Sequence, residues 1–128
     1  DGPLFHGPSF QVIREIVSCT PASIAARLAT AGEMGWPDAW QLDPAALDGA
    51  LQLLRVWGIA QGGRPSLPTA IGRCRAWAPW PRAGEVGCTL QCRQDNPFRI
   101  SADALFVEPE TGRPLLSLDG IVMHVQAA

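Results

Sequence analysis

Glycine and proline interrupt this chain so often that only one stretch can form a long helix. The sequence holds 13 glycines and 12 prolines among 128 residues, and both residue types break regular structure. The exception runs from residue 43 to residue 58. Asp43 can cap its free backbone N–H groups, Pro44 suits the first helical position, and Gly58 suits the end. We therefore predict one helix with its body at 45–57.

The predicted helix is apolar on nearly every side. Two stripes run along it, consisting of Leu47, Leu51 and Leu54, and of Ala46, Ala50, Leu53 and Trp57. A helix with this pattern is expected to be buried on most of its sides. Its polar exceptions therefore need an account, and they are Asp48, Gln52 and Arg55.

The rest of the chain alternates between strand-like runs and turn residues. The predicted strands are Val12–Cys19, Ser23–Leu28, Ile71–Trp77, Val86–Arg93, Phe98–Glu108 and Leu115–Val125. Glu110–Arg113 predicts a hairpin turn, and Gly120 predicts a bulge in the last strand. One central helix wrapped by a curled antiparallel sheet is an α+β arrangement. We predict it for a single domain covering residues 1–128.

Composition excludes several classes of function. Hydrophobic residues make up 47% of the chain and charged residues 17%, which is typical of a globular domain. The ten basic residues are all arginines and form no cluster, so no nucleic-acid partner is expected. No apolar run is long enough to span a membrane. The N-terminus lacks a signal segment and a starting Met, which predicts a chain excised from a longer one or processed.

The cysteines do not form a metal-binding pattern. A structural zinc site needs two tight ligand pairs, and only Cys88 and Cys92 form even a loose pair. We interpret Cys19, Cys74, Cys88 and Cys92 as small buried apolar residues in a reducing cytoplasm.

Asp48 and Gln52 are four residues apart and therefore share one face of the helix. The helix dipole favours a charged Asp48, whereas burial raises its pKa. A carboxyl group held between these effects can act as a general acid. Such a pair near a helix start is more commonly capping and surface decoration, so the helix pattern alone leaves both interpretations open.

Three separated segments carry a more specific pattern. They read Phe5-His6-Gly7-Pro8-Ser9-Phe10-Gln11, then Leu42-Asp43-Pro44-Ala45-Ala46-Leu47-Asp48-Gly49-Ala50-Leu51-Gln52, then Leu67-Pro68 ahead of Gly72-Arg73-Cys74-Arg75. Their order and spacing resemble the C-terminal half of the dehydratase domains of polyketide synthases and polyunsaturated fatty acid synthases. The resemblance covers nearly the whole chain. It implies a hotdog fold, as the second half of a double hotdog.

The resemblance also implies site residues. Asp48 would protonate the departing β-hydroxyl group, and Gln52 would orient Asp48 and contact the substrate or its pantetheine arm. His6 stands where the family often has Tyr and could still donate a hydrogen bond, although a locally bonded loop histidine is equally expected. The remaining matched residues would line or shape the substrate-binding side, and they are Pro8, Phe10, Leu67 and Pro68. Ile71 replaces the Trp usual in the family.

The family's general base is a His in a His-x-x-x-Gly-x-x-x-x-Pro motif, and this sequence has no such motif. Of its two histidines, His6 lacks that context, and His124 is interpreted as structural. The chain is therefore expected to be inactive alone and to need an N-terminal hotdog half, with a homodimer as the other possible pairing. The implied substrate is a (3R)-hydroxyacyl group on the phosphopantetheine of an acyl carrier protein. No metal or organic cofactor is expected beyond that carrier.

Two other functions stay open from the sequence. The chain can be a non-catalytic dehydratase-like domain that binds acyl chains or gives structural support to a megasynthase. It can also be a product-template-like domain that guides cyclisation of a polyketide with a similar His and Asp pair.

Overall fold

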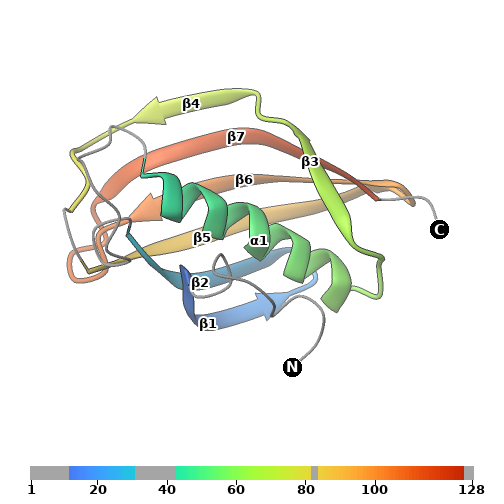
Figure 1. The fold of residues 1–128 in the computed structure, drawn as a ribbon, viewed down its shortest axis with the longest axis horizontal. Helices are drawn as coiled ribbons and strands as arrows, with labels where there is room; N and C mark the ends of the chain where they lie inside the picture. Colours follow the sequence, from blue (N-terminus) through green and yellow to red (C-terminus); the bar gives the residue numbers. More distant parts are fainter. Residues whose placement is uncertain (1–11, 31–42, 82–83, 126–128) are drawn as a thin grey trace.

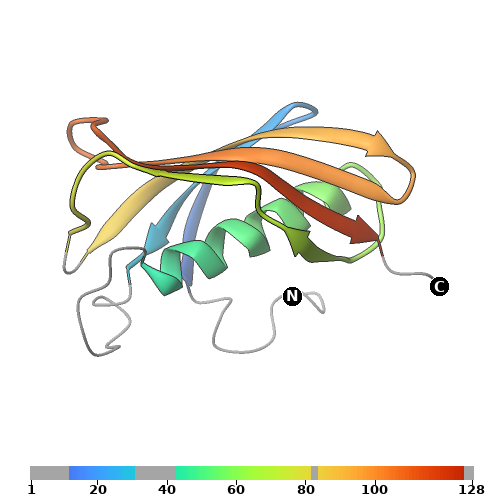
Figure 2. The same cartoon turned by 90° about the horizontal axis from the view of Figure 1, so that it is seen from above.

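One helix lies across the concave side of a curled antiparallel sheet in the computed structural model (Figures 1 and 2). The structure describes residues 12–30, 43–81 and 84–125. In chain order, the elements are β1 (Ile13–Thr20), β2 (Ser23–Ala29), α1 (Pro44–Ala60), β3 (Ser66–Ala70), β4 (Arg73–Ala76), β5 (Glu85–Asn96), β6 (Arg99–Val107) and β7 (Pro114–Val125).

The strands form one sheet in the order β1-β2-β5-β6-β7-β3, and β4 also pairs with β7. Every pairing is antiparallel. Residues facing the helix are apolar on successive strands, as at Leu90, Ala104 and Leu118. The α+β class and the predicted wrapping of an antiparallel sheet around one helix are confirmed.

The start of α1 follows the sequence prediction. Asp43 is the N-cap, and its Oδ1 accepts a hydrogen bond of 3.0 Å from the backbone N–H of Ala46. Pro44 occupies the first turn, where its missing N–H leaves no broken bond. Among the described residues, no helix is long and apolar enough to cross a membrane.

The predicted helix end at Gly58 is wrong. The helix continues to Ala60, and the backbone turns at Gly62, whose φ is +88°. Gly58 instead provides a close approach, because a Cβ there would lie 3.0 Å from Cδ1 of Ile100. The glycine that ends the helix is therefore the one with the left-handed conformation.

Every residue of the helix except Ala60 is buried or partly buried. Its fully buried residues all face the sheet, and they are Ala45, Ala46, Gly49, Ala50, Leu53, Leu54, Trp57 and Gly58. The opposite side carries Leu51, Asp48 and Arg55, all only partly buried. The indole Nε1 of Trp57 donates a hydrogen bond of 2.8 Å to the backbone oxygen of Thr20, which ties α1 to the β1–β2 turn.

The predicted strands are present with shifted ends. Val12–Cys19 and Ser23–Leu28 correspond to β1 and β2, and the last three predicted strands correspond to β5, β6 and β7. Ile71–Trp77 shrinks to the four residues of β4. The strand pattern missed β3, which contains Pro68 and is the edge strand beside β7. Proline is tolerated at such an edge because one side of the strand needs no partner.

The predicted bulge at Gly120 is confirmed. Ala102 pairs with Ile121 and Ala104 pairs with Leu118, so β7 holds one more residue than β6 between these pairs. Gly120 has a φ of +71°, which glycine adopts without steric cost.

Candidate active site

Asp48 and Gln52 lie on the side of α1 that faces away from the sheet. Asp48 is in the second turn, and Gln52 follows one turn later, about 40° further around the helix axis. Both side chains are partly buried. The sheet-facing residues fix this orientation, because rotating the helix about its axis would expose Leu53 and Trp57, which are now buried.

The environment of Asp48 shifts its protonation equilibrium. Burial raises the pKa of the Asp48 carboxyl above its ordinary value of 3.8. Desolvation acts against the nearby helix N-terminus, which favours the charged form. A carboxyl group with a raised pKa stays protonated to higher pH and can donate its proton to a bound oxygen atom.

Leu67 and Pro68 lie on β3, away from this pair in sequence and on an edge of the sheet. Leu67 pairs with His124 and Pro68 with Met123 of β7. Leu67 is 46% exposed. Among the described residues, no hydrogen bond or ion pair joins either residue to Asp48 or Gln52. Their predicted role in substrate binding stays a prediction.

His124 has a local partner. Its Nδ1 lies 2.8 Å from the hydroxyl oxygen of Thr69 on the neighbouring strand. This contact agrees with the structural interpretation of His124. The other predicted entry residues, His6, Pro8 and Phe10, lie outside the described residues.

The cysteines fall into two groups. Cys88 and Cys92 face the core, and burial raises the pKa of both thiols, that of Cys92 to about 12. The prediction of burial is wrong for Cys19 and Cys74, which are exposed on β1 and β4. No group of three or more His, Cys, Asp or Glu side chains within the described part of the chain could hold a metal ion.

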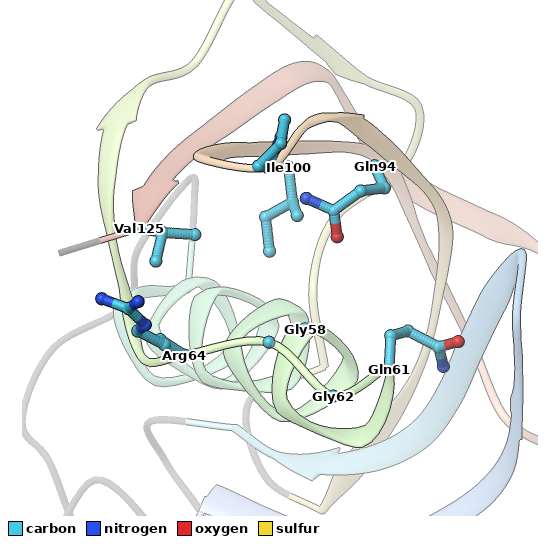
Figure 3. A pocket seen from close by; sticks show the side chains of 9 residues that line it. Gly58, Gln61, Gly62, Arg64, Gln94, Ile100 and Val125 are labelled. Atoms are coloured by element: carbon cyan, nitrogen blue, oxygen red, sulfur yellow. The ribbon is translucent and has the colours of Figure 1, made fainter. Parts of the chain in front are cut away.

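A shallow pocket of about 200 Å³ opens at the other end of α1 (Figure 3). Gly58, Gln61 and Arg64 line it from the helix end, and the sheet adds Gln94, Ile100 and Val125. Gly58 lies ten residues beyond Asp48, or about 15 Å along the helix. The pocket is therefore separate from the Asp48 and Gln52 pair. Sequence reasoning missed it because its walls come from three distant segments.

Comparison with known sequences points to one family. The family model described as the polyketide synthase dehydratase N-terminal domain matches residues 1–127. A polyunsaturated fatty acid synthase protein of Thraustochytrium sp. is 28% identical over 127 residues, covering 94% of this chain. The chain spans only 4% of that relative's length.

Solved structures show the same fold at low identity. The dehydratase domain of RzxB from Pseudomonas fluorescens is 18% identical, with a TM-score of 0.71, over 92% of this chain and 42% of that one. Zebra fish thioesterase superfamily member 2 is 10% identical, also with a TM-score of 0.71, over 96% of this chain and 91% of that one. These likenesses show that the fold is the hotdog fold that the sequence predicted.

Proposed function

This chain belongs to the polyketide synthase dehydratase family, and from that premise we propose that it supplies the acid in a 3-hydroxyacyl thioester dehydratase. The substrate is a (3R)-hydroxyacyl group on the phosphopantetheine of an acyl carrier protein. The product is the trans-2-enoyl thioester, and the enzyme is a hydro-lyase of polyketide or polyunsaturated fatty acid synthesis.

The observation that carries this proposal is the state of Asp48. Its carboxyl group is partly buried, its pKa is raised by that burial, and it stands on the helix side not occupied by the sheet. In the reaction, a base removes the α-proton, the α,β double bond forms, and the bond from the β-carbon to its hydroxyl oxygen breaks. Asp48 gives its proton to that oxygen, so water leaves. Gln52, one turn away, orients the carboxyl group and contacts the substrate.

The base must come from outside this chain. We propose that the chain is the C-terminal hotdog half, although the matching family model is named for the N-terminal domain. One observation supports this assignment. The sequence holds the Asp-x-x-x-Gln spacing and no His-x-x-x-Gly-x-x-x-x-Pro motif. The chain covers 42% of the RzxB dehydratase domain, which fits one hotdog of either half. The partner is then an N-terminal half that carries the His, and two copies of this chain alone would lack a family-type base.

The test is Asp48→Asn in the intact polypeptide that carries this chain, assayed with a 3-hydroxyacyl carrier substrate. Asparagine keeps the size of the side chain but has no proton to donate, so dehydration should fall by about 100-fold or more. Asp119→Asn is the matched control, because Asp119 is exposed on β7, and its activity should be unchanged. Retained turnover in Asp48→Asn would refute the assignment.

A second candidate is a non-catalytic domain that binds acyl chains or supports the synthase. The missing His motif favours it. A wild-type intact polypeptide that binds but does not dehydrate the carrier substrate would select this function. A cyclised product in place of an enoyl thioester would instead identify a domain that guides cyclisation.

A further inference from the structure

Arg55 stands on the same side of α1 as Asp48, two turns further along. Seven residues rotate the helix by about 700°, which is about 20° short of two full turns, and advance it by about 10 Å. Gln52 lies between the two. The sheet-facing side is made entirely of small and apolar residues. The three polar side chains of α1 beyond its N-cap therefore form one row on the opposite side, here called the polar row (Asp48, Gln52 and Arg55).

The side chain of Arg55 holds a buried donor without a partner. Its Nε is buried and has no hydrogen-bond partner in the part of the chain that the structure describes. Other arginines of the chain, such as Arg27 and Arg113, form ion pairs at exposed positions. A guanidinium group stays charged at any physiological pH, and burying one of its N–H groups unpaired costs free energy. A bound acceptor would offset that cost.

Arg55 does not serve Asp48. Burial raises the pKa of Asp48, whereas an ion pair with a guanidinium would lower it. No ion pair joins the two residues within the described ranges. Since the described residues offer Nε of Arg55 no acceptor, a bound molecule is the candidate source of one.

We propose that Arg55 binds the first amide carbonyl of the pantetheine arm that carries the substrate, an inference that rests on the proposed function of Asp48. Seven bonds separate the hydroxyl-bearing carbon of a 3-hydroxyacyl thioester from that carbonyl carbon, a reach of roughly 9 Å when extended. This reach matches the spacing of about 10 Å between Asp48 and Arg55 along the helix. A hydrocarbon tail has no acceptor, so a buried N–H favours the arm over the tail.

The test compares two small thioesters in the intact polypeptide. The 3-hydroxybutyryl N-acetylcysteamine thioester has the amide carbonyl, and the S-propyl thioester lacks it. Arg55→Met keeps the length of the stem and removes the donors. We expect kcat/KM to fall about tenfold on the first ester, chiefly through KM, and to change less than about twofold on the second. Arg55→Lys keeps the charge but lacks Nε. Its kcat/KM on the first ester should lie between that of the wild type and that of Arg55→Met. The pH profile of dehydration should stay unchanged, because Arg55 does not set the pKa of Asp48.

Equal losses on both esters, or no loss on either, would overturn the assignment of Arg55. Arg113→Met is the matched control, since Arg113 is exposed at the turn before β7, and both esters should react as with the wild type. If the wild type dehydrates neither ester, the proposed function fails by itself. Titration of free pantetheine then still tests Arg55: binding about tenfold weaker in Arg55→Met supports the contact, and equal affinity refutes it.

Discussion

The carboxylate of Asp103 on β6 accepts a hydrogen bond of 2.9 Å from the backbone N–H of Gly120 at the bulge of β7. That N–H has left the regular ladder because of the extra residue in β7. The bond from Gly120 is the largest cause that lowers the pKa of Asp103, and Arg93, which lies 3.3 Å away, lowers it further. A side chain thus replaces the strand partner that the bulge removes.

Asp103→Ala should lower the free energy of unfolding by about 1 kcal/mol at neutral pH, because the bulge N–H loses its acceptor. The folded-state pKa is lowered, so the stabilisation is present above the ordinary pKa of 3.8 and is lost as pH falls through the lowered value. Urea unfolding at pH 7 and pH 3 checks this. Asp119 is the exposed residue before Gly120. Asp119→Ala should therefore change the free energy of unfolding little at either pH.

Asp48→Asn should have the opposite pH dependence. The folded-state pKa of Asp48 is raised, so its carboxylate destabilises the fold once pH rises above the ordinary value of 3.8. The variant should therefore match the wild type below that pH and become slightly more stable than the wild type above it. Unfolding curves from pH 3 to pH 8 measure the difference. A difference that does not vary with pH would mean that the carboxyl is solvated in the folded protein.

The same raised pKa predicts the pH dependence of catalysis. Asp48 must be protonated to act as an acid, so kcat should fall as pH rises through its raised pKa. The falling limb should disappear in Asp48→Asn, whose residual rate has no such acid. If the wild-type polypeptide and Asp48→Asn show the same pH profile, this carboxyl has no role in proton donation.

Gly49→Ala should destabilise the fold even though alanine is the better helix former. A Cβ at Gly49 would lie 2.8 Å from Cγ1 of Val12 and 3.1 Å from both Cδ atoms of Leu28. Overpacking of this kind costs about 1–3 kcal/mol, which exceeds the gain of about 1 kcal/mol in helix propensity. Chemical denaturation measures the net effect. Gly49→Ala combined with Val12→Ala, which removes the closest atom, should recover part of the loss.

Local chemistry made some of the fold predictable. Asp43 and Pro44 mark the helix start whatever surrounds them, and the structure places both there. The helix end was misplaced because Gly58 is required by contact with Ile100, and that contact depends on how β6 crosses the helix. β3 was missed because Pro68 reads as a break, whereas an edge strand tolerates it.

The candidate site was predictable only in part. Helix spacing was enough to put Asp48 and Gln52 on one face, but only the sheet determines that this face points away from it. The sequence shows Arg55 as a polar residue in a mostly apolar helix but assigns it no role. Its unpaired Nε emerged only from the packing around it. The residues that line the pocket beside Gly62 come from segments whose proximity no local pattern encodes.

The two sides of α1 differ in how well they tolerate substitution. The side against the sheet tolerates little change, as the contacts of Gly49 and Gly58 indicate. The residues of the polar row are only partly buried, so substitutions there are expected to cost less stability than at those glycines. A lineage carrying this helix can therefore acquire a new reaction by changing a few side chains on one surface.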